Sequence, residues 1–196
     1  MNYPKEFENL IDAFRRLPGV GYKSAERMAY QMLEMKEEYR EKFSSAINEI
    51  DHLKKCKICH NLSSSDICEI CSDNERDKSV ICVVQNIKDV YAIEKSNSYN
   101  GLYHVLDGVI SVKSGKLPED LNIDSLLDRL LDGVNEVIIA TNPNLDGETT
   151  ALFIAKLLEN KNIKTTRLAY GLPMGGNLEY SDDVTIMKSF ENRKSF

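Results

Sequence analysis

The sequence has no apolar run approaching the ~20 residues that cross a bilayer, and it has no internal repeat or low-complexity tract. Its first ten residues, MNYPKEFENL, carry acidic side chains where a signal peptide needs a basic region and an apolar stretch. From these absences we expect a soluble, cytoplasmic protein with no membrane contact. The 196 residues, 42% of them hydrophobic, are enough for a real core in one large domain or two small ones.

The chain also lacks an excess of positive charge, since its formal net charge is −6. Residues 1–60 nevertheless carry 11 Lys or Arg against 10 Asp or Glu, so the remaining chain carries −7. Four cations in the first part stand near one acid, namely Arg15, Arg16, Lys23 and Arg27 near Glu26. Because a DNA backbone meets a local patch rather than the global charge, a nucleic-acid partner is not excluded.

Hydrophobic periodicity divides the chain into a helical part and a mixed part. Apolar residues at helical spacing predict three amphipathic helices, on Phe7, Leu10, Ile11 and Phe14, on Ala25, Met28, Ala29 and Met32, and on Phe43, Ala46, Ile47 and Ile50. After residue 80, apolar runs at 80–84, 103–106, 137–140 and 165–169 alternate with helical stretches at 88–95, 123–131 and 148–159, before a last helix at 182–193. Apolar strands separated by helices indicate a parallel α/β sheet.

The expected fold is therefore a multi-part α+β protein. It comprises a helical region at 1–53, a polar four-cysteine segment at 54–77, an α/β domain with a parallel sheet at 78–174, and a C-terminal tail and helix at 175–196. The cysteine segment has too few aliphatic residues for a core of its own, so it needs a covalent or metal staple.

Two CxxC pairs, Cys56 with Cys59 and Cys68 with Cys71, are typical of one tetrahedral zinc site. Four thiolates leave no open coordination position, so the zinc would be structural. Two disulfides or four unliganded thiols are the alternatives. His60 could replace a cysteine as a ligand, but it is better interpreted as a solvated neighbour. The fifth cysteine, Cys82, lies in an apolar strand and is expected to be buried.

The segment LPGVGYKSAERMAY lies between the first two predicted helices and resembles the helix-hairpin-helix motif, a module that binds the DNA backbone without regard to sequence. Gly19 and Gly21 permit a sharp turn and close approach of the backbone to a ligand. The following helix begins with free N–H groups, which suit a phosphate. Lys23 and Arg27, one turn apart, would extend that contact. The alternative is an ordinary helix-helix turn with surface cations.

Carboxylates are missing where the α/β domain would need them. The stretch TNPNLDGE resembles the DxDxxGE stretch of the Toprim domain of topoisomerases and primases, whose enzymes hold Mg²⁺ with the DxD pair and a Glu after the first strand. In this chain those positions are the amides Asn142, Asn144 and Gln85, which bind Mg²⁺ much more weakly. Asp146 and Glu148 remain acidic, and helix capping and dipole complementarity explain them better than metal binding, although some Mg²⁺ affinity stays open.

In this order, the motifs resemble the bacterial recombination mediator family RecR over nearly the whole chain. The resemblance rests on LPGVGYKSAERMAY, CxxCHNLSSSDICxxC, ICVVQNIKDVYAIE, NGLYHVLDGVIS, EVIIATNPNLDGETTA and TRLAYGLPMGGNLEYSDDVTI. The loop at 111–118 departs from the family pattern, which usually has Pro after the Ser and a DGIGP-like turn, so its conformation is open.

The resemblance implies a non-enzymatic mediator of recombinational DNA repair at the nucleoid. RecR proteins form homodimers and tetrameric rings around DNA, associate with RecO or RecF, and help load RecA on SSB-coated single strands. By position, Lys23 and Arg27 would contact single- or double-stranded DNA, and the cysteines would hold one structural Zn²⁺. Glu179, Tyr180, Asp182 and Asp183 would be partner contacts or, equally well, surface turn and helix-start residues.

Two hypotheses from other classes remain. An active Mg²⁺-dependent Toprim nuclease or primase is disfavoured by the three missing carboxylates. A zinc-ribbon interaction protein that never touches DNA would show no retention on single-stranded DNA at low salt.

Overall fold

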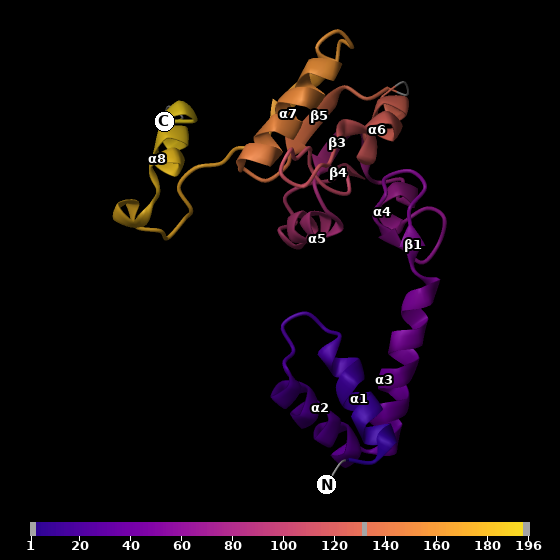
Figure 1. Ribbon diagram of the computed structural model, residues 1–196. Coiled ribbons are helices and arrows are strands. Elements are labelled where there is room, and N and C mark those ends of the chain that lie inside the picture. Colours follow the sequence, from indigo (N-terminus) through magenta and orange to yellow (C-terminus); the bar gives the residue numbers. More distant parts are fainter. Residues whose placement is uncertain (1–2, 131–132, 194–196) are drawn as a thin grey trace. The chain divides into compact units, whose positions relative to one another are not determined.

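The computed structural model describes residues 3–130 and 133–193. The chain divides into two compact units, Met1–His52 and Leu53–Phe196, which are described separately below (Figure 1). Within the described residues, no helix is both long and apolar enough to cross a bilayer.

The first unit is helical, as expected. Helix α1 spans Lys5–Arg15, α2 spans Tyr22–Glu34, α3 spans Glu37–Glu49, and a short 3-10 turn η1 follows at Ile50–His52. The first two helices pack on each other, and their shared core comprises Phe7, Ile11, Ala25 and Ala29. The two alanines let α1 approach α2 closely, because they present no side chain beyond Cβ.

The third helix forms where the periodicity predicts it, but its apolar residues are not covered. Helix α3 contains no buried residue, and the side chains of Phe43 and Ile47 are 45% and 53% exposed. The spacing therefore predicted the helix correctly, although its apolar side chains stay largely exposed among the described residues.

The second unit begins with the cysteine segment (residues 54–72). Strand β1 (Lys54–Lys55) pairs antiparallel with β2 (Leu62–Ser63), and one helical turn, α4, follows at Glu69–Ser72. Three of the segment's four cysteines are buried and form its small core, so its structure depends on sulfur rather than on aliphatic side chains.

The sheet domain (residues 77–167) contains the predicted parallel sheet. Strands β3 (Asp77–Val84), β4 (Gly101–Val105), β5 (Glu136–Ala140) and β6 (Lys164–Arg167) lie in the order β4-β3-β5-β6, and each neighbouring pair is parallel. All four carboxyl ends therefore lie at one edge. At that edge Val84 is opposite Ala140, and Ile139 is opposite Arg167.

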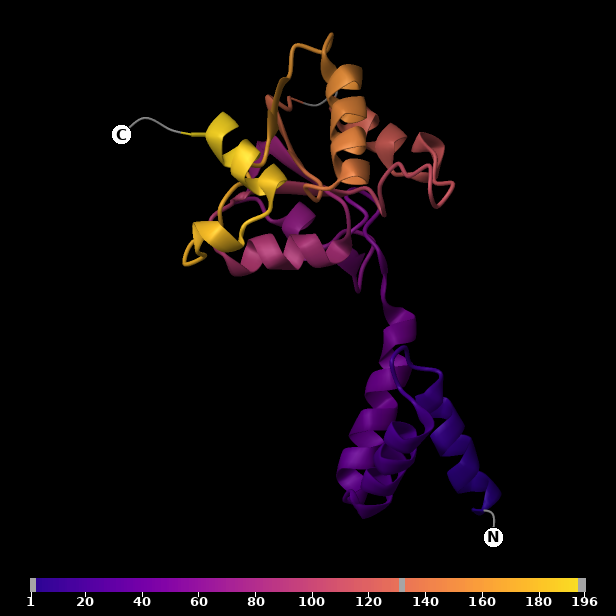
Figure 2. The same ribbon diagram turned by 60° about the vertical axis from the view of Figure 1, so that its left-hand side comes forward.

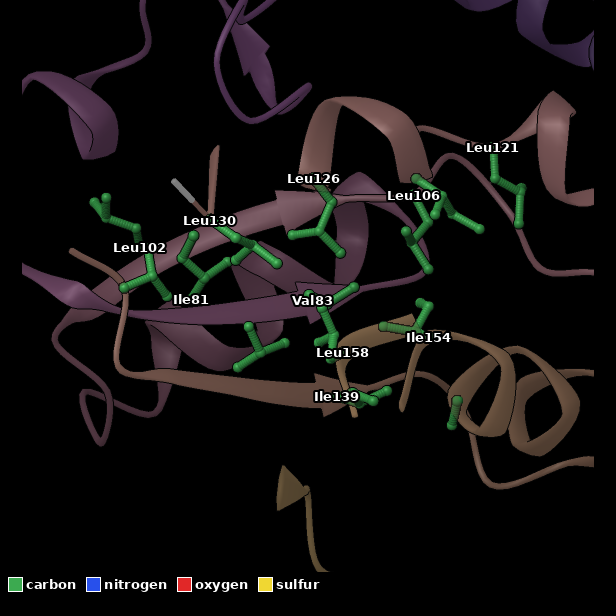
Figure 3. Packing of buried hydrophobic residues seen from close by; sticks show 14 residues of the cluster. Ile81, Val83, Leu102, Leu106, Leu121, Leu126, Leu130, Ile139, Ile154 and Leu158 are labelled. Atoms are coloured by element: carbon green, nitrogen blue, oxygen red, sulfur yellow. The ribbon is translucent and has the colours of Figure 1, made fainter. Parts of the chain in front are cut away.

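Helices cover both faces of this sheet (Figure 2). On one face, α6 (Ile123–Arg129) and α7 (Leu145–Leu158) pack against the strands, and Figure 3 shows Leu126, Ile154 and Leu158 directed toward Ile81, Val83 and Ile139. On the other face, α5 (Ile87–Lys95) covers a cluster that includes Cys82, which is buried as predicted. Helices on both faces explain why β3, β4 and β5 contain continuous apolar runs, whereas the edge strand β6 is polar.

Some element boundaries differ from the prediction. Helix α7 begins at Leu145, three residues early, because the side chain of Asn144 accepts a hydrogen bond from the Gly147 N–H (2.8 Å) and caps the helix. Strand β6 ends at Arg167 rather than at residue 169. The predicted end of the 123–131 helix, residue 131, lies outside the described residues.

Two further segments complete the second unit. In the loop at 111–118, Ser111 and Lys116 exchange backbone hydrogen bonds across a tight turn, and the 3-10 turn η2 follows at Pro118–Asp120. The tail contains the 3-10 turn η3 (Leu178–Tyr180) and helix α8 (Asp183–Glu191).

Candidate metal centre and nucleic-acid interface

The four cysteine sulfurs of the cysteine segment lie within 4.8 Å of one another. The sulfurs of Cys59 and Cys68 are 3.5 Å apart, too far for a disulfide. Tetrahedral zinc with Zn–S bonds of about 2.3 Å requires sulfur-sulfur distances of about 3.8 Å. The residues therefore fit one zinc ion, and all four cysteines are free thiols in this structure, so the two disulfides left open by the spacing do not form here.

Local bonds hold these sulfurs in place. The backbone N–H of Cys68 donates to the sulfur of Cys56 (3.3 Å), an interaction that strengthens when the sulfur is a thiolate. The hydrogen bond with Cys68 raises the pKa of the Cys59 thiol. Four thiolates this close together repel one another, so they need a cation to coexist, and zinc binding must release protons.

The turn between α1 and α2 has the geometry expected for a phosphate contact. Gly19 has φ +79°, a conformation that side chains with Cβ rarely adopt. Gly21 is the N-cap of α2, which has neither a side-chain cap nor an acidic residue in its first turn. The first N–H groups of α2 therefore point outward with the positive end of the helix dipole uncompensated.

The cations near this turn are not equivalent. Lys23 and Arg27 are exposed on α2, and the described residues show no ion pair for either. Arg15, by contrast, forms an exposed ion pair with Asp12 (3.0 Å) and lies over the Tyr22 ring. Glu26 is therefore not the only acid near these cations, and its own carboxylate accepts a hydrogen bond from the Tyr3 hydroxyl (2.8 Å).

Gln85 and Asn142 both lie at the carboxyl edge of the sheet, where the resemblance to Toprim placed them. Gln85 directly follows β3, and its Oε1 is buried with no hydrogen-bond partner among the described residues. Asn142 follows β5 and is exposed. The side-chain oxygen of Asn144 is already engaged in a hydrogen bond, because it caps α7.

The remaining acids, Asp146 and Glu148, have one of the two roles expected of them. Capping by Asp146 or Glu148 is wrong, because Asn144 caps α7 and both acids lie in the first turn, where they complement the helix dipole. Glu148 also accepts from Nη2 of Arg167 on β6 (2.7 Å).

These residues do not fit the Mg²⁺ of Toprim enzymes. Two candidate ligands are neutral amides, a third amide caps a helix, and one carboxylate is paired with a guanidinium. In the part of the chain that the structure describes, the four cysteines are the one group of three or more potential ligands close enough to share a metal.

Four family models match consecutive segments of the chain. The helix-hairpin-helix model of RecR matches residues 7–50, and the four-cysteine zinc finger domain of RecR matches 53–73. The Toprim domain model matches 79–169, and the C-terminal model of RecR matches 171–194.

The chain belongs to the RecR family.

RecR membership assigns the protein to recombinational DNA repair, in which RecR proteins act as recombination mediators. The zinc finger match and the sulfur geometry agree, so this RecR protein has one structural zinc. The helix-hairpin-helix match agrees with the turn at Gly19 and Gly21.

His60 is not the solvated neighbour that its position beside Cys59 suggested. It has φ +61° and is half-buried, and its Nε2 is 2.8 Å from the Ser125 hydroxyl on α6. The backbone N–H of Val105 donates to the Cys59 carbonyl (2.9 Å). This RecR protein therefore joins its zinc finger to the sheet domain, a connection that sequence spacing alone does not reveal.

The C-terminal residues Glu179, Tyr180, Asp182 and Asp183 are exposed. Asp182 caps α8 by accepting from the Thr185 N–H (2.9 Å), which supports the helix-start interpretation for this residue. Tyr180, the last residue of η3, is 81% exposed.

Proposed function

We propose that this protein binds single- and double-stranded DNA without sequence preference through the turn at Gly19 and Gly21 and through Lys23 and Arg27. The observation that carries the proposal is the first turn of α2. It has no acidic residue or side-chain cap, and the exposed cations Lys23 and Arg27 lie one helical turn apart. Phosphates bind at such helix termini because N–H groups and the dipole favour negative charge.

We further propose that the protein acts as a homodimer or tetrameric ring with RecO, RecF or both, helping to load RecA on SSB-coated strands. The RecR family matches support this role. In this proposal the four cysteines ligate the zinc. The chain comprises four functional regions, namely the helical region 1–53, the finger 54–77, the Toprim domain 78–174 and the tail 175–196. The cytoplasm, at the nucleoid, is the proposed location.

The Toprim domain acts as a scaffold in this proposal, not as an enzyme. Gln85, Asn142 and Asn144 present neutral oxygens where metal-dependent relatives present carboxylates. The support comes from these residue identities and from the Glu148–Arg167 pair.

The test measures DNA affinity as a function of salt for the variants Lys23→Ala and Arg27→Ala. If each cation neutralises one phosphate, each variant should weaken binding for all sequences alike. The slope of log K against log salt should fall by about 0.7 for single strands and about 0.9 for duplex.

Lys42→Ala is the matched control, because Lys42 is an exposed cation of the same unit whose charge is already paired with Glu38. It should leave the slope unchanged. A Lys23→Ala/Arg27→Ala double variant with wild-type affinity and slope would place the DNA contact elsewhere.

The same variants test the mediator role when RecA loading on SSB-coated strands is measured with and without RecO. Wild-type and Lys42→Ala proteins should accelerate loading, and the double variant should not. Mg²⁺-dependent nicking of plasmid DNA by the wild-type protein would instead support the nuclease hypothesis.

A further inference from the structure

Arg167 lies on β6 opposite Ile139, and its guanidinium reaches the carboxyl end of β5. Nη1 donates to the Ile139 carbonyl (2.8 Å), and Nη2 donates to the Thr141 carbonyl (2.7 Å) and to Glu148 Oε1 (2.7 Å). The Tyr170 ring lies 5.6 Å from the guanidinium carbon. A single positive charge therefore bridges two backbone carbonyls and a carboxylate at the sheet edge.

This edge is where a Toprim enzyme would hold its metal. Thr141 immediately precedes Asn142, and Glu148 lies in the first turn of α7, whose cap is Asn144. Carbonyl and carboxylate oxygens are the ligands that hard divalent cations prefer. The guanidinium thus takes up oxygens of the kind a metal would use, in the same part of the fold.

The pair is partly shielded from water. The side chains of Arg167 and Glu148 are 24% and 36% exposed, and the Arg167 Nε is buried without a partner among the described residues. Like charges repel strongly at short range when water is partly excluded. A divalent cation approaching this edge would have to displace or outcompete the guanidinium.

We propose that Arg167 is a built-in cation that replaces the Toprim metal, holding the end of β5 against α7 and excluding Mg²⁺ from this edge. The inference deepens the proposed non-enzymatic role of the Toprim domain. In this proposal two features together exclude Mg²⁺ from the edge: the missing carboxylates and the positive charge of Arg167. Arg167 is a positioning residue in this scheme, since it acts on protein groups and not on a substrate.

The experiment restores the three carboxylates with Gln85→Glu, Asn142→Asp and Asn144→Asp, and combines them with Arg167→Met or Arg167→Lys. Arg167→Met removes the charge but keeps an unbranched stem, and Arg167→Lys keeps the charge. Mg²⁺ binding is measured from the thermal shift against MgCl₂ concentration, with circular dichroism as a check of folding.

The triple variant with Arg167 intact should bind Mg²⁺ weakly, because the guanidinium repels the ion and pairs with the new carboxylates. Adding Arg167→Met should tighten Mg²⁺ binding on the order of tenfold or more, and adding Arg167→Lys should not. A merely structural role for Arg167 predicts loss of stability in both combinations, with no gain in Mg²⁺ affinity.

Equal Mg²⁺ affinity with and without Arg167 would overturn the proposal. If the Arg167→Met combination folds only when Mg²⁺ is added, the ion has replaced the guanidinium and the proposal is supported. If it remains unfolded at every Mg²⁺ concentration, a cation cannot substitute for Arg167 and the proposal is wrong. DNA binding by the hairpin is not read in this experiment, so either result leaves that proposal standing.

Discussion

His104 on β4 is fully buried in a polar network whose geometry fixes its charge state. Its Nε2 is 2.6 Å from the Asn122 carbonyl, which can only accept, so Nε2 carries the proton. Its Nδ1 is 3.0 Å from Nη1 of Arg129 and must therefore accept. The imidazole is neutral in this arrangement. Neither ring nitrogen is available for a second proton, because Nε2 carries one and Nδ1 accepts from Arg129.

This network predicts a specific pH dependence of stability. Burial, with the nearby Arg129 and His60, lowers the pKa of His104 from 6.5 to about 3. Between pH 6.5 and about pH 3, His104 therefore binds a proton in the unfolded chain but not in the folded chain. The contribution of His104 is thus complete above pH 6.5 and is lost as the pH falls toward 3, by up to about 1.4 kcal/mol per pH unit.

The measurement is the free energy of unfolding between pH 7 and pH 4.5 with zinc supplied in excess. Relative to wild type, His104→Gln should be less stable at pH 7 and should lose stability more slowly as the pH falls. The exposed His52 provides the control, since His52→Gln should leave the curve unchanged. Parallel curves for His104→Gln and wild type would show that His104 does not carry the effect.

Individual residues differ in how far sequence alone could define them. The four cysteines were predictable, because CxxC spacing itself encodes the geometry of a tetrahedral site. His60 and Arg167 were not, because their partners Ser125 and Glu148 are far away in sequence and meet them only in the folded chain. For Arg167 the sequence shows only a cation at the end of a polar edge strand, which does not by itself indicate a partner.

At the scale of elements, the zinc finger and the sheet domain share bonds that make them interdependent. The Val105 N–H donates to the Cys59 carbonyl, His60 contacts Ser125, and Lys55 forms an ion pair with Asp107 (2.7 Å). The first of these bonds continues the end of β4 into the finger. Loss of the finger's structure must therefore leave the Val105 N–H without its acceptor, although β4 stays paired with β3.

Removing the zinc should consequently affect more than the finger. Because structural zinc contributes roughly 10–16 kcal/mol of apparent binding energy in small finger peptides, Cys56→Ala or Cys71→Ala should unfold the cysteine segment and lower solubility. Amide exchange should also accelerate at Val105, at the end of β4. Ile139 on β5 is the internal reference, because its strand makes no contact of this kind with the finger.

Purified protein that contains no zinc, with four titratable thiols in the native state, would contradict the zinc assignment itself. If zinc is lost but amide exchange at Val105 does not change, the zinc assignment stands and the coupling between the finger and the sheet domain is wrong.

Elements were easier to predict than their ends. The apolar runs identified β3, β4 and β5, because strands buried on both faces need continuous apolar sequence. The edge strand β6 is polar and only partly buried, and the run predicted at 165–169 overlaps it only in part. The predicted start of α7 is late, in keeping with capping by Asp146 or Glu148, whereas the cap is Asn144. The Asn144 side chain stands both at a Toprim metal position and at a helix N-cap position. The hydrogen bond that it accepts from the Gly147 N–H determines where the helix begins.

At the scale of the whole molecule, the two units differ greatly in how much core they hold. The unit Met1–His52 buries four hydrophobic side chains in one cluster, whereas the unit Leu53–Phe196 has clusters on both faces of a sheet and a zinc site besides. A domain of about 50 residues is marginal even with a good core.

We therefore expect residues 53–196, expressed alone, to bind zinc and to melt in one cooperative transition. Residues 1–52 alone should show helical circular dichroism that declines gradually on heating. The larger fragment should also lose most DNA affinity, since it lacks the hairpin. A sharp, reversible melting transition in the 1–52 fragment would show that its small core suffices.

The position of Cys82 separates the five cysteines into two chemical classes. Its side chain is 3% exposed beneath α5, and burial raises the pKa of its thiol to about 12. Because alkylating reagents attack thiolates, Cys82 is protected both by its surroundings and by its proton. The other four sulfurs become reactive when zinc departs and the cysteine segment unfolds, whereas Cys82 reacts only when the sheet opens. The natural sequence thus carries two separate covalent reporters, one of metal loss and one of unfolding, with no label to be engineered.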